Sequence, residues 1–218
     1  MLLGIKTQRG AVVASSEPGA FTSIGGHILV GASGHRGLVQ RIRREIERAE
    51  VSGVFDNEHD VNIVIGHLQG AIRSQLAPEL EAAATAQQVV GSDINSAVQV
   101  ETIVAFPFHH RCHLFHFDRA GACLEAEGDD PFLLAANPPG GARMFLHFLQ
   151  RMIFPGQLPA REQACLAATW LHHQAERREP AQLLSVQPSE ELEWIVANEE
   201  PAPWRERVKE WEEKWGEG

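Results

Sequence analysis

The chain has 218 residues, of which 44% are hydrophobic and 22% are charged, and its formal net charge is −10. A chain of this length buries roughly 70% of the surface that its unfolded form exposes, so it needs no disulfide or metal to be stable. An acidic surface repels phosphate backbones and anionic lipid. The composition therefore excludes nucleic acid and membrane surfaces as expected partners.

The cysteines and the apolar runs predict a cytoplasmic protein. Cys112, Cys123 and Cys165 form an odd set without a CxxC pair, which fits a reducing compartment better than a disulfide framework. The longest apolar runs are strand-sized, so no membrane span is expected. The first six residues, MLLGIK, lack the basic start and apolar core of an export signal.

The first 90 residues predict a block of strands followed by a block of helices. Short apolar runs separated by turn signals predict four strands, over residues 2–7, 11–14, 20–24 and 27–32. Apolar residues at helical spacing then predict two helices, over 38–49 and from an N-cap at Asp60 onward. Pro78 is expected to kink the second helix before its Ala-rich end, and Gly91, Ser92 and Asp93 are expected to terminate it.

The remainder repeats this block pattern. Strands are expected over 98–106, 111–118, 123–127 and 132–136, and again over 183–186 and 192–196. Helices are expected over 142–153, 159–178 and 206–214, the first of them after a break at Asn137–Gly141. Grouped strand and helix blocks disfavour simple βαβ winding. They predict an α+β fold, a four-layer αββα sandwich of two antiparallel sheets flanked by helix pairs, over residues 1–198, with a separate amphipathic helix over 199–218.

Three segments resemble the proteasome-type branch of the N-terminal nucleophile hydrolases. The segments GIKT and GAVVA, at residues 4–7 and 10–14, are similar to the opening hairpin of that family. Residues 24–34, IGGHILVGASG, are similar to its next hairpin and to the turn into its first long helix. Residues 114–121, LFHFDRAG, are similar to its apolar strand closed by Asp and Gly. The resemblance extends to about Val196.

The resemblance implies a threonine nucleophile at the start of the mature chain, with its own amine as base, an Asp and a Lys nearby, and a backbone N–H for the oxyanion. On this sequence the nucleophile position falls in front of Met1, the acidic position on Ser16 and the lysine position near Ala20. The oxyanion turn is kept at Gly34. A later segment that usually carries another Asp and Ser falls on residues 179–184, which contain neither. The resemblance thus implies a kept fold, lost proteolysis and a vestigial cleft at Ser15, Ser16 and Gly34.

Three functions follow as hypotheses. The leading one is a catalytically inactive, proteasome-like subunit that forms an oligomeric ring with itself, or beside a catalytic or regulatory partner subunit, as scaffold, gate or chamber wall. The second is a threonine-type endopeptidase whose nucleophile lies outside this sequence. The third is a module that binds a peptide or small molecule in the vestigial cleft. Catalysis is expected to be absent in the first and third, and no cofactor is expected in any of them.

Histidines and a cysteine between residues 109 and 116 form the densest set of metal-ligand types in the sequence. On a strand, His110, Cys112 and His116 would share one face, and three such ligands could hold zinc. However, His110 and His116 would be about 20 Å apart along an extended strand. His110 and Cys112 are therefore weak metal candidates, and Cys112 is expected to be a small buried hydrophobe. Elsewhere, His172 and His173 are neighbours that point to different sides of a helix and add little.

The C-terminal helix carries an aromatic stripe. Trp204, Val208, Trp211 and Trp215 are spaced four, three and four residues apart, which places them on one helix face. Packing of this stripe on its own domain is favoured over the alternative, in which it docks a neighbouring subunit through its tryptophans.

Overall fold

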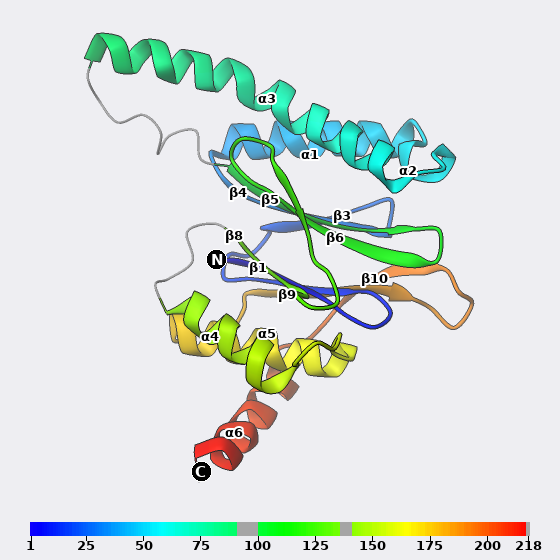
Figure 1. Cartoon of the computed structure of the whole chain (residues 1–218), viewed down its shortest axis with the longest axis vertical. Helices are drawn as coiled ribbons and strands as arrows, with labels where there is room; N and C mark the ends of the chain where they lie inside the picture. Colours follow the sequence, from blue (N-terminus) through cyan, green and yellow to red (C-terminus); the bar gives the residue numbers. More distant parts are fainter. Residues whose placement is uncertain (91–99, 136–140, 217–218) are drawn as a thin grey trace.

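Two five-stranded antiparallel sheets stack face to face at the centre of the molecule (Figure 1). The structure is a computed structural model that describes residues 1–90, 100–135 and 141–216, without the side chains of residues 86–90, 152 and 214–216. Sheet A has the strand order β10-β9-β2-β1-β8, and sheet B has the order β3-β4-β5-β6-β7. The strands of sheet A are β1 (Leu2–Lys6), β2 (Ala11–Ser15), β8 (Phe132–Ala135), β9 (Gln182–Pro188) and β10 (Trp194–Asn198). Those of sheet B are β3 (Phe21–Ile24), β4 (Ile28–Gly34), β5 (Val100–Phe108), β6 (Arg111–Phe117) and β7 (Cys123–Glu125).

Helices cover the outer face of each sheet. On sheet B lie α1 (Arg36–Val51), the short α2 (Val54–Asn57) and α3 (Val61–Val90). On sheet A lie α4 (Ala142–Phe148), the π-helical turn η2 (Leu149–Ile153) and α5 (Arg161–Glu176), and α6 (Ala202–Gly216) packs outside α5. The expected αββα sandwich of antiparallel sheets is therefore confirmed. None of the helices in the described ranges combines the length and the apolar character that crossing a bilayer would require.

Three apolar cores follow from this layering. The inner faces of the two sheets enclose one core, in which Leu29, Ile103 and Leu114 are fully buried. The other two cores lie between sheet B and α1 and α3, and between sheet A and α4 and α5. Gly4 lets the sheets approach closely, because a Cβ there would lie 3.1 Å from Leu114 and 3.3 Å from Ile103.

The structure adds local detail to the predicted elements. Pro78 does not interrupt α3, because it lies on an exposed part of the helix where water can satisfy the carbonyl that loses its partner. Asp60 caps this helix as predicted, since its Oδ1 accepts a hydrogen bond of 2.9 Å from the backbone N–H of Asn62. The short helix α2 was not predicted, and the end of the helix predicted over 142–153 takes the π-helical form of η2. The breaks expected at 91–93 and 137–140 lie outside the described residues.

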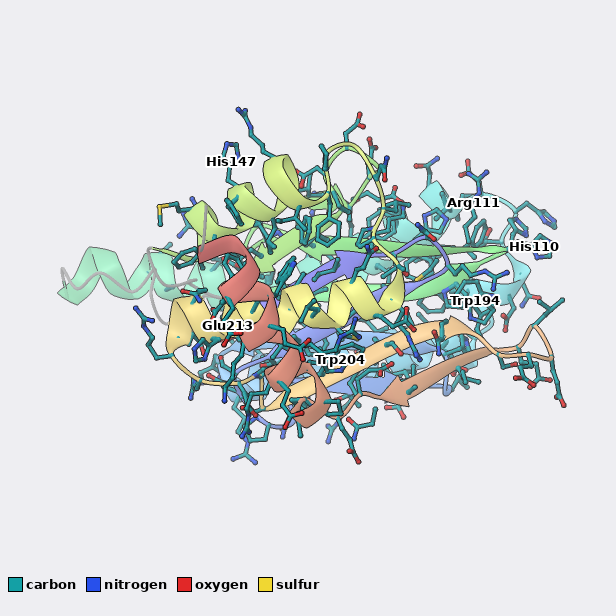
Figure 2. All side chains as sticks on the ribbon, turned by 90° about the horizontal axis from the view of Figure 1, so that it is seen from below. His110, Arg111, His147, Trp194, Trp204 and Glu213 are labelled. Carbon is teal, nitrogen blue, oxygen red and sulfur yellow. The ribbon has the colours of Figure 1, made fainter. Side chains whose placement is uncertain are left out.

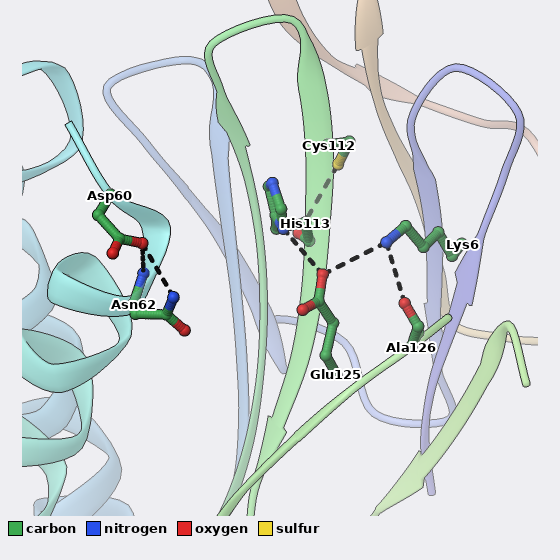
Figure 3. A network of polar contacts seen from close by, with 7 residues as sticks. All are labelled: Lys6, Asp60, Asn62, Cys112, His113, Glu125 and Ala126. Atoms are coloured by element: carbon green, nitrogen blue, oxygen red, sulfur yellow. Dashed lines mark hydrogen bonds and ion pairs between the residues drawn. The ribbon is translucent and has the colours of Figure 1, made fainter. Parts of the chain in front are cut away.

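A polar network links the two sheets at the end of β1 (Figure 3). The ammonium of Lys6 lies 3.4 Å from Glu125 Oε1 and donates to the carbonyl oxygen of Ala126 at 3.0 Å. The same carboxylate oxygen lies 2.8 Å from Nδ1 of His113. Lys6 belongs to sheet A and Glu125 to sheet B, and both side chains are mostly buried, at 19% and 28% exposed. This network therefore fixes one corner of the sandwich.

We expect Lys6→Met to lower the free energy of unfolding by about 1–2 kcal/mol, because a partly buried carboxylate loses a charge-assisted partner. Urea unfolding would measure this loss. Glu125→Gln and the double variant complete a double-mutant cycle. We expect the double variant to lose less unfolding free energy than the sum of the two single losses. Lys209→Met, at an exposed position of α6, is the matched control and should change stability little. Additive losses would contradict a direct link between the sheets.

Candidate functional site

A buried polar cluster lies where β1 begins and β2 ends. The amino group of Met1 donates to Ser16 Oγ at 2.8 Å and lies 3.4 Å from Glu176 Oε1. The antiparallel pairing of β1 with β2 places the first residue of β1, Leu2, opposite the last residue of β2, Ser15. Glu176 comes from the last turn of α5, which packs on both strands. The cluster is therefore built from the start of β1, the end of β2 and the end of α5.

His172 lies one turn before Glu176 on α5 and is fully buried. Its Nδ1 lies 3.0 Å from the carbonyl oxygen of Ala168, and its Nε2 is buried without a hydrogen-bond partner. Burial lowers the pKa of His172 to about 4, against smaller raising effects of the Ala168 carbonyl and Glu176. The imidazole is therefore neutral at physiological pH, with a free nitrogen in the protein interior.

The pKa of Glu176 lies below its ordinary value. Burial alone would raise this pKa, but the hydrogen bond from Arg178, the amino group of Met1 and the hydroxyl of Ser16 together outweigh burial. The carboxylate is thus charged at neutral pH and is shared between Arg178, at 2.9 Å, and the cluster. The arrangement holds a fixed ion pair and offers no carboxylic acid for proton transfer.

The three residues expected in a vestigial cleft occupy different surroundings. Ser15 and Ser16 are adjacent at the end of β2 and are 0% and 5% exposed. Ser15 Oγ accepts a hydrogen bond of 3.0 Å from the backbone N–H of Glu17. Gly34 is exposed at the end of β4 in the other sheet, opposite Val100, and no hydrogen bond of the described residues joins it to either serine. The structure thus brings Ser15 and Ser16 together and gives Gly34 no direct link to them.

The position expected for a lysine is apolar. Ala20 is 7% exposed and belongs to the core between the sheets. The sequence contains three lysines, at 6, 209 and 214, and Lys6 is engaged at the far end of β1. Instead, Arg43 of α1 donates to the carbonyl oxygens of Gly19, at 3.0 Å, and Ala20. Burial lowers the pKa of Arg43, but a guanidinium remains protonated in proteins and cannot replace an amine that releases a proton.

The cysteines and the histidine-rich strand contribute no activated group in the described structure. Burial raises the pKa of Cys112 and Cys165 to about 12 and that of Cys123 to about 11, so all three free thiols stay protonated at neutral pH. His110 is exposed in the turn before β6, whereas Cys112 is buried in the core between the sheets. Within the described ranges, no group of three His, Cys, Asp or Glu residues is placed to hold a metal ion.

Sequence reasoning missed two members of the cluster. It gave His172 little weight because His172 and His173 are neighbours that point to different sides of a helix, and it did not single out Glu176. His172 differs from its exposed neighbour His173 only in the helix face it occupies. The helical phase of the apolar residues on α5 would have identified the buried face. The contact of Glu176 with Ser16 joins residues more than 150 positions apart in the sequence, so no local pattern predicts it.

The neutral buried His172 makes stability sensitive to acid. Above pH ~6.5 the residue is uncharged in both states, but between pH ~6.5 and ~4 only the unfolded chain takes up the proton. The native state should lose on the order of 3 kcal/mol across this window. We expect His172→Leu to remove this loss, as measured by urea unfolding across the window. His147→Leu, at an exposed position of α4 (Figure 2), should keep it. An unchanged pH dependence in His172→Leu would contradict the assignment.

Comparison with known proteins bears on the fold. No protein-family model and no curated protein matches the sequence. Three solved structures match 99% of this chain over 94% of their own. Anbu (ancestral beta-subunit) from Yersinia bercovieri superposes with a TM-score of 0.67 at 14% identity. The Anbu (Gly-1) mutant from Hyphomicrobium sp. strain MC1 gives 0.64 at 12%, and Anbu from the helical assembly of Pseudomonas aeruginosa gives 0.63 at 14%. The chain therefore has the proteasome-like fold of the Anbu structures.

Proposed function

We propose that this chain is a subunit of a self-assembled, proteasome-related complex and that it does not cleave peptides. The match to Anbu over nearly the whole chain supports the assembly, because one matching structure is the helical assembly of the Anbu complex from Pseudomonas aeruginosa. Its role would be that of a scaffold, gate or chamber wall, alone or beside a catalytic or regulatory partner subunit. The free cysteines with protonated thiols are consistent with a cytoplasmic location.

The composition of the buried cluster carries the proposal of inactivity. Ser16 occupies the position that the family resemblance assigns to an acid, and the apolar Ala20 occupies that of the lysine. A threonine nucleophile needs both groups to tune its hydroxyl and its amine. The cation that reaches Ala20 is the permanently protonated Arg43. Restoring the nucleophile alone would leave these two groups missing.

The peptidase hypothesis and the binding-module hypothesis each require features at the candidate site. A peptidase would need a nucleophile outside this sequence and would have to work without the lysine. A binding module would need access to Ser15 and Ser16, both of which are buried. The lining of the cavity described below includes neither serine. The inactive subunit is therefore the hypothesis that the geometry supports best.

We further propose that residues 199–218 form a C-terminal extension that stabilises its own domain. Val208 is 4% exposed, and Trp204 and Trp211 pack against the core under α4 and α5. The side chain of Trp215 lies outside the described residues. The exposed side of α6, where Arg205 pairs with Glu179, then replaces the tryptophan stripe as the candidate interface. On this basis the tryptophan stripe stabilises its own domain. It contributes to assembly only by holding α6 in place, with the exposed side of the helix facing outward.

Light scattering of the purified chain, with a fluorogenic peptide assay on the same peak, tests the function. We expect a particle of many subunits that does not cleave the peptide. Ser16→Ala should leave both results unchanged, because no reaction depends on its hydroxyl. A particle that cleaves peptide, and loses this activity in Ser16→Ala, would contradict inactivity. A monomer at all concentrations would contradict assembly.

Trp204→Ala separates the two roles of the C-terminal helix. We expect a lower melting temperature, because a partly buried indole leaves the core, and an unchanged particle size. Light scattering and thermal unfolding on the same sample measure both. Arg205→Ala, one residue further on the exposed side, is the control and should leave melting nearly unchanged. An unchanged melting temperature with dissociated particles in Trp204→Ala would assign the stripe to docking instead.

A further inference from the structure

A cavity of about 360 Å³ opens between α4, η2, α5 and α6, on the outside of sheet A. Its volume lies within the range of ~300–1,000 Å³ that is common for ligand pockets. It is separate from the buried cluster, because its walls include neither serine nor Glu176. Figure 2 shows from below how α6 crosses α5. The family resemblance assigns no role to this place.

Aromatic rings form most of the apolar wall. Trp170 stands at the centre, with its ring centroid 5.8 Å from that of Phe148 and 6.1 Å from that of Trp211. The ring of Trp211 is nearly perpendicular to that of Trp170, at 76°. A perpendicular pair of rings presents both a ring face and a ring edge, and a further flat ring can pack against either of them. The shape of the wall therefore favours a planar ligand.

The polar side of the cavity carries an unpaired cation. The guanidinium of Arg177 has no hydrogen bond or ion pair to any described residue, whereas the adjacent Arg178 is paired with Glu176. His173 also lines the cavity, one turn earlier on α5. The one carboxylate of the lining residues, Glu212, already accepts a hydrogen bond from Gln174. On a protein with a net charge of −10, an arginine left unpaired at a cavity is available for an anion.

The backbone presents this arginine in a strained form. Arg177 ends α5 with φ of +56°, a left-handed conformation in which glycine or asparagine is the usual residue. A bulky residue held there is the kind of outlier that leads to a hypothesis of function. The neighbouring η2 is a π-helical turn, a form that occurs often at functional sites. Both deviations from regular helix border the same cavity.

From the flat aromatic wall and the free arginine we infer that this cavity binds a small planar aromatic carboxylate. The ring lies against Trp170 and Trp211, and the carboxylate accepts hydrogen bonds from the Arg177 guanidinium. A charged pair of this kind is bidentate and specific for a planar anion. The inference is independent of the proposed assembly, because one subunit supplies every wall described.

Calorimetric titration with three probes of one ring type tests the inference. The probes are indole-3-acetate, which carries the carboxylate, indole, which carries no charge, and tryptamine, which carries an ammonium. We expect indole-3-acetate to bind most tightly and tryptamine most weakly. An equal affinity for all three, or a preference for tryptamine, overturns the inference, and so does the absence of binding at millimolar concentrations.

Two variants separate the arginine from the aromatic wall. Arg177→Asn suits the left-handed backbone, so the fold should be kept, and the affinity for indole-3-acetate should fall about tenfold toward that of indole. Trp170→Leu should weaken both indole-3-acetate and indole. Arg119→Asn, in the exposed turn between β6 and β7, makes the same change in net charge far from the cavity and should leave all affinities unchanged.

Thermal unfolding of each variant checks the fold. Wild-type affinity in a folded Arg177→Asn variant overturns the assignment of the arginine.

Light scattering on the titrated sample separates a ligand cavity from an interface between copies. If indole-3-acetate binds only the dissociated chain, a second copy covers the cavity and the inference is wrong. Binding of equal strength to the assembled and dissociated chain supports it.

Discussion

The close approach of two apolar sheet faces is the constraint on which the rest of the structure depends. Each sheet has two faces, and only one can be buried against the other sheet. The second face must be covered by helices, which accounts for α1 and α3 on one side and α4 and α5 on the other. At Gly4 the sheets lie so close that even a methyl group would press on Leu114. The sandwich is thus fixed from its centre outward.

The same layering creates the polar cluster and isolates it. Because β1 and β2 are neighbours in sheet A, the start of one and the end of the other must lie together. The helix that covers them, α5, must turn one face inward, and His172 falls on that face with the apolar residues. Burial lowers the pKa of the imidazole, while Arg178, the amino group of Met1 and the Ser16 hydroxyl outweigh burial and hold the pKa of the Glu176 carboxyl below its ordinary value. The electrostatics of the site follow from the packing.

Much of the fold could be predicted from the sequence, because periods of 2 and 3.6 residues are local signals. The strand from Ile28 and the helix around Ile42 show them clearly, and the grouped order of elements indicated two antiparallel sheets. Less of the site than of the fold could be predicted from the sequence. The position of Ser16 could be inferred from its place after the second strand. The approach of Arg43 to Ala20 could not, since it depends on how α1 lies across sheet B. The π-helical turn η2 also differs from an α-helix in backbone hydrogen bonds between residues five apart, such as that from Phe154 N–H to the Leu149 carbonyl oxygen, which the side-chain pattern does not indicate.

The second half of α3 stands apart from these constraints. Beyond Pro78 nearly all described side chains are exposed or only half-buried, and Leu80 is 41% exposed, while the helix extends past the body of the molecule (Figure 1). Each residue adds about 1.5 Å, so the arm gains reach while Ala83 is its one described side chain that packs on the core. Folding therefore exerts little selection on its sequence. This segment can change from one relative to another, and acquire or lose a contact, while the domain that carries it keeps its stability.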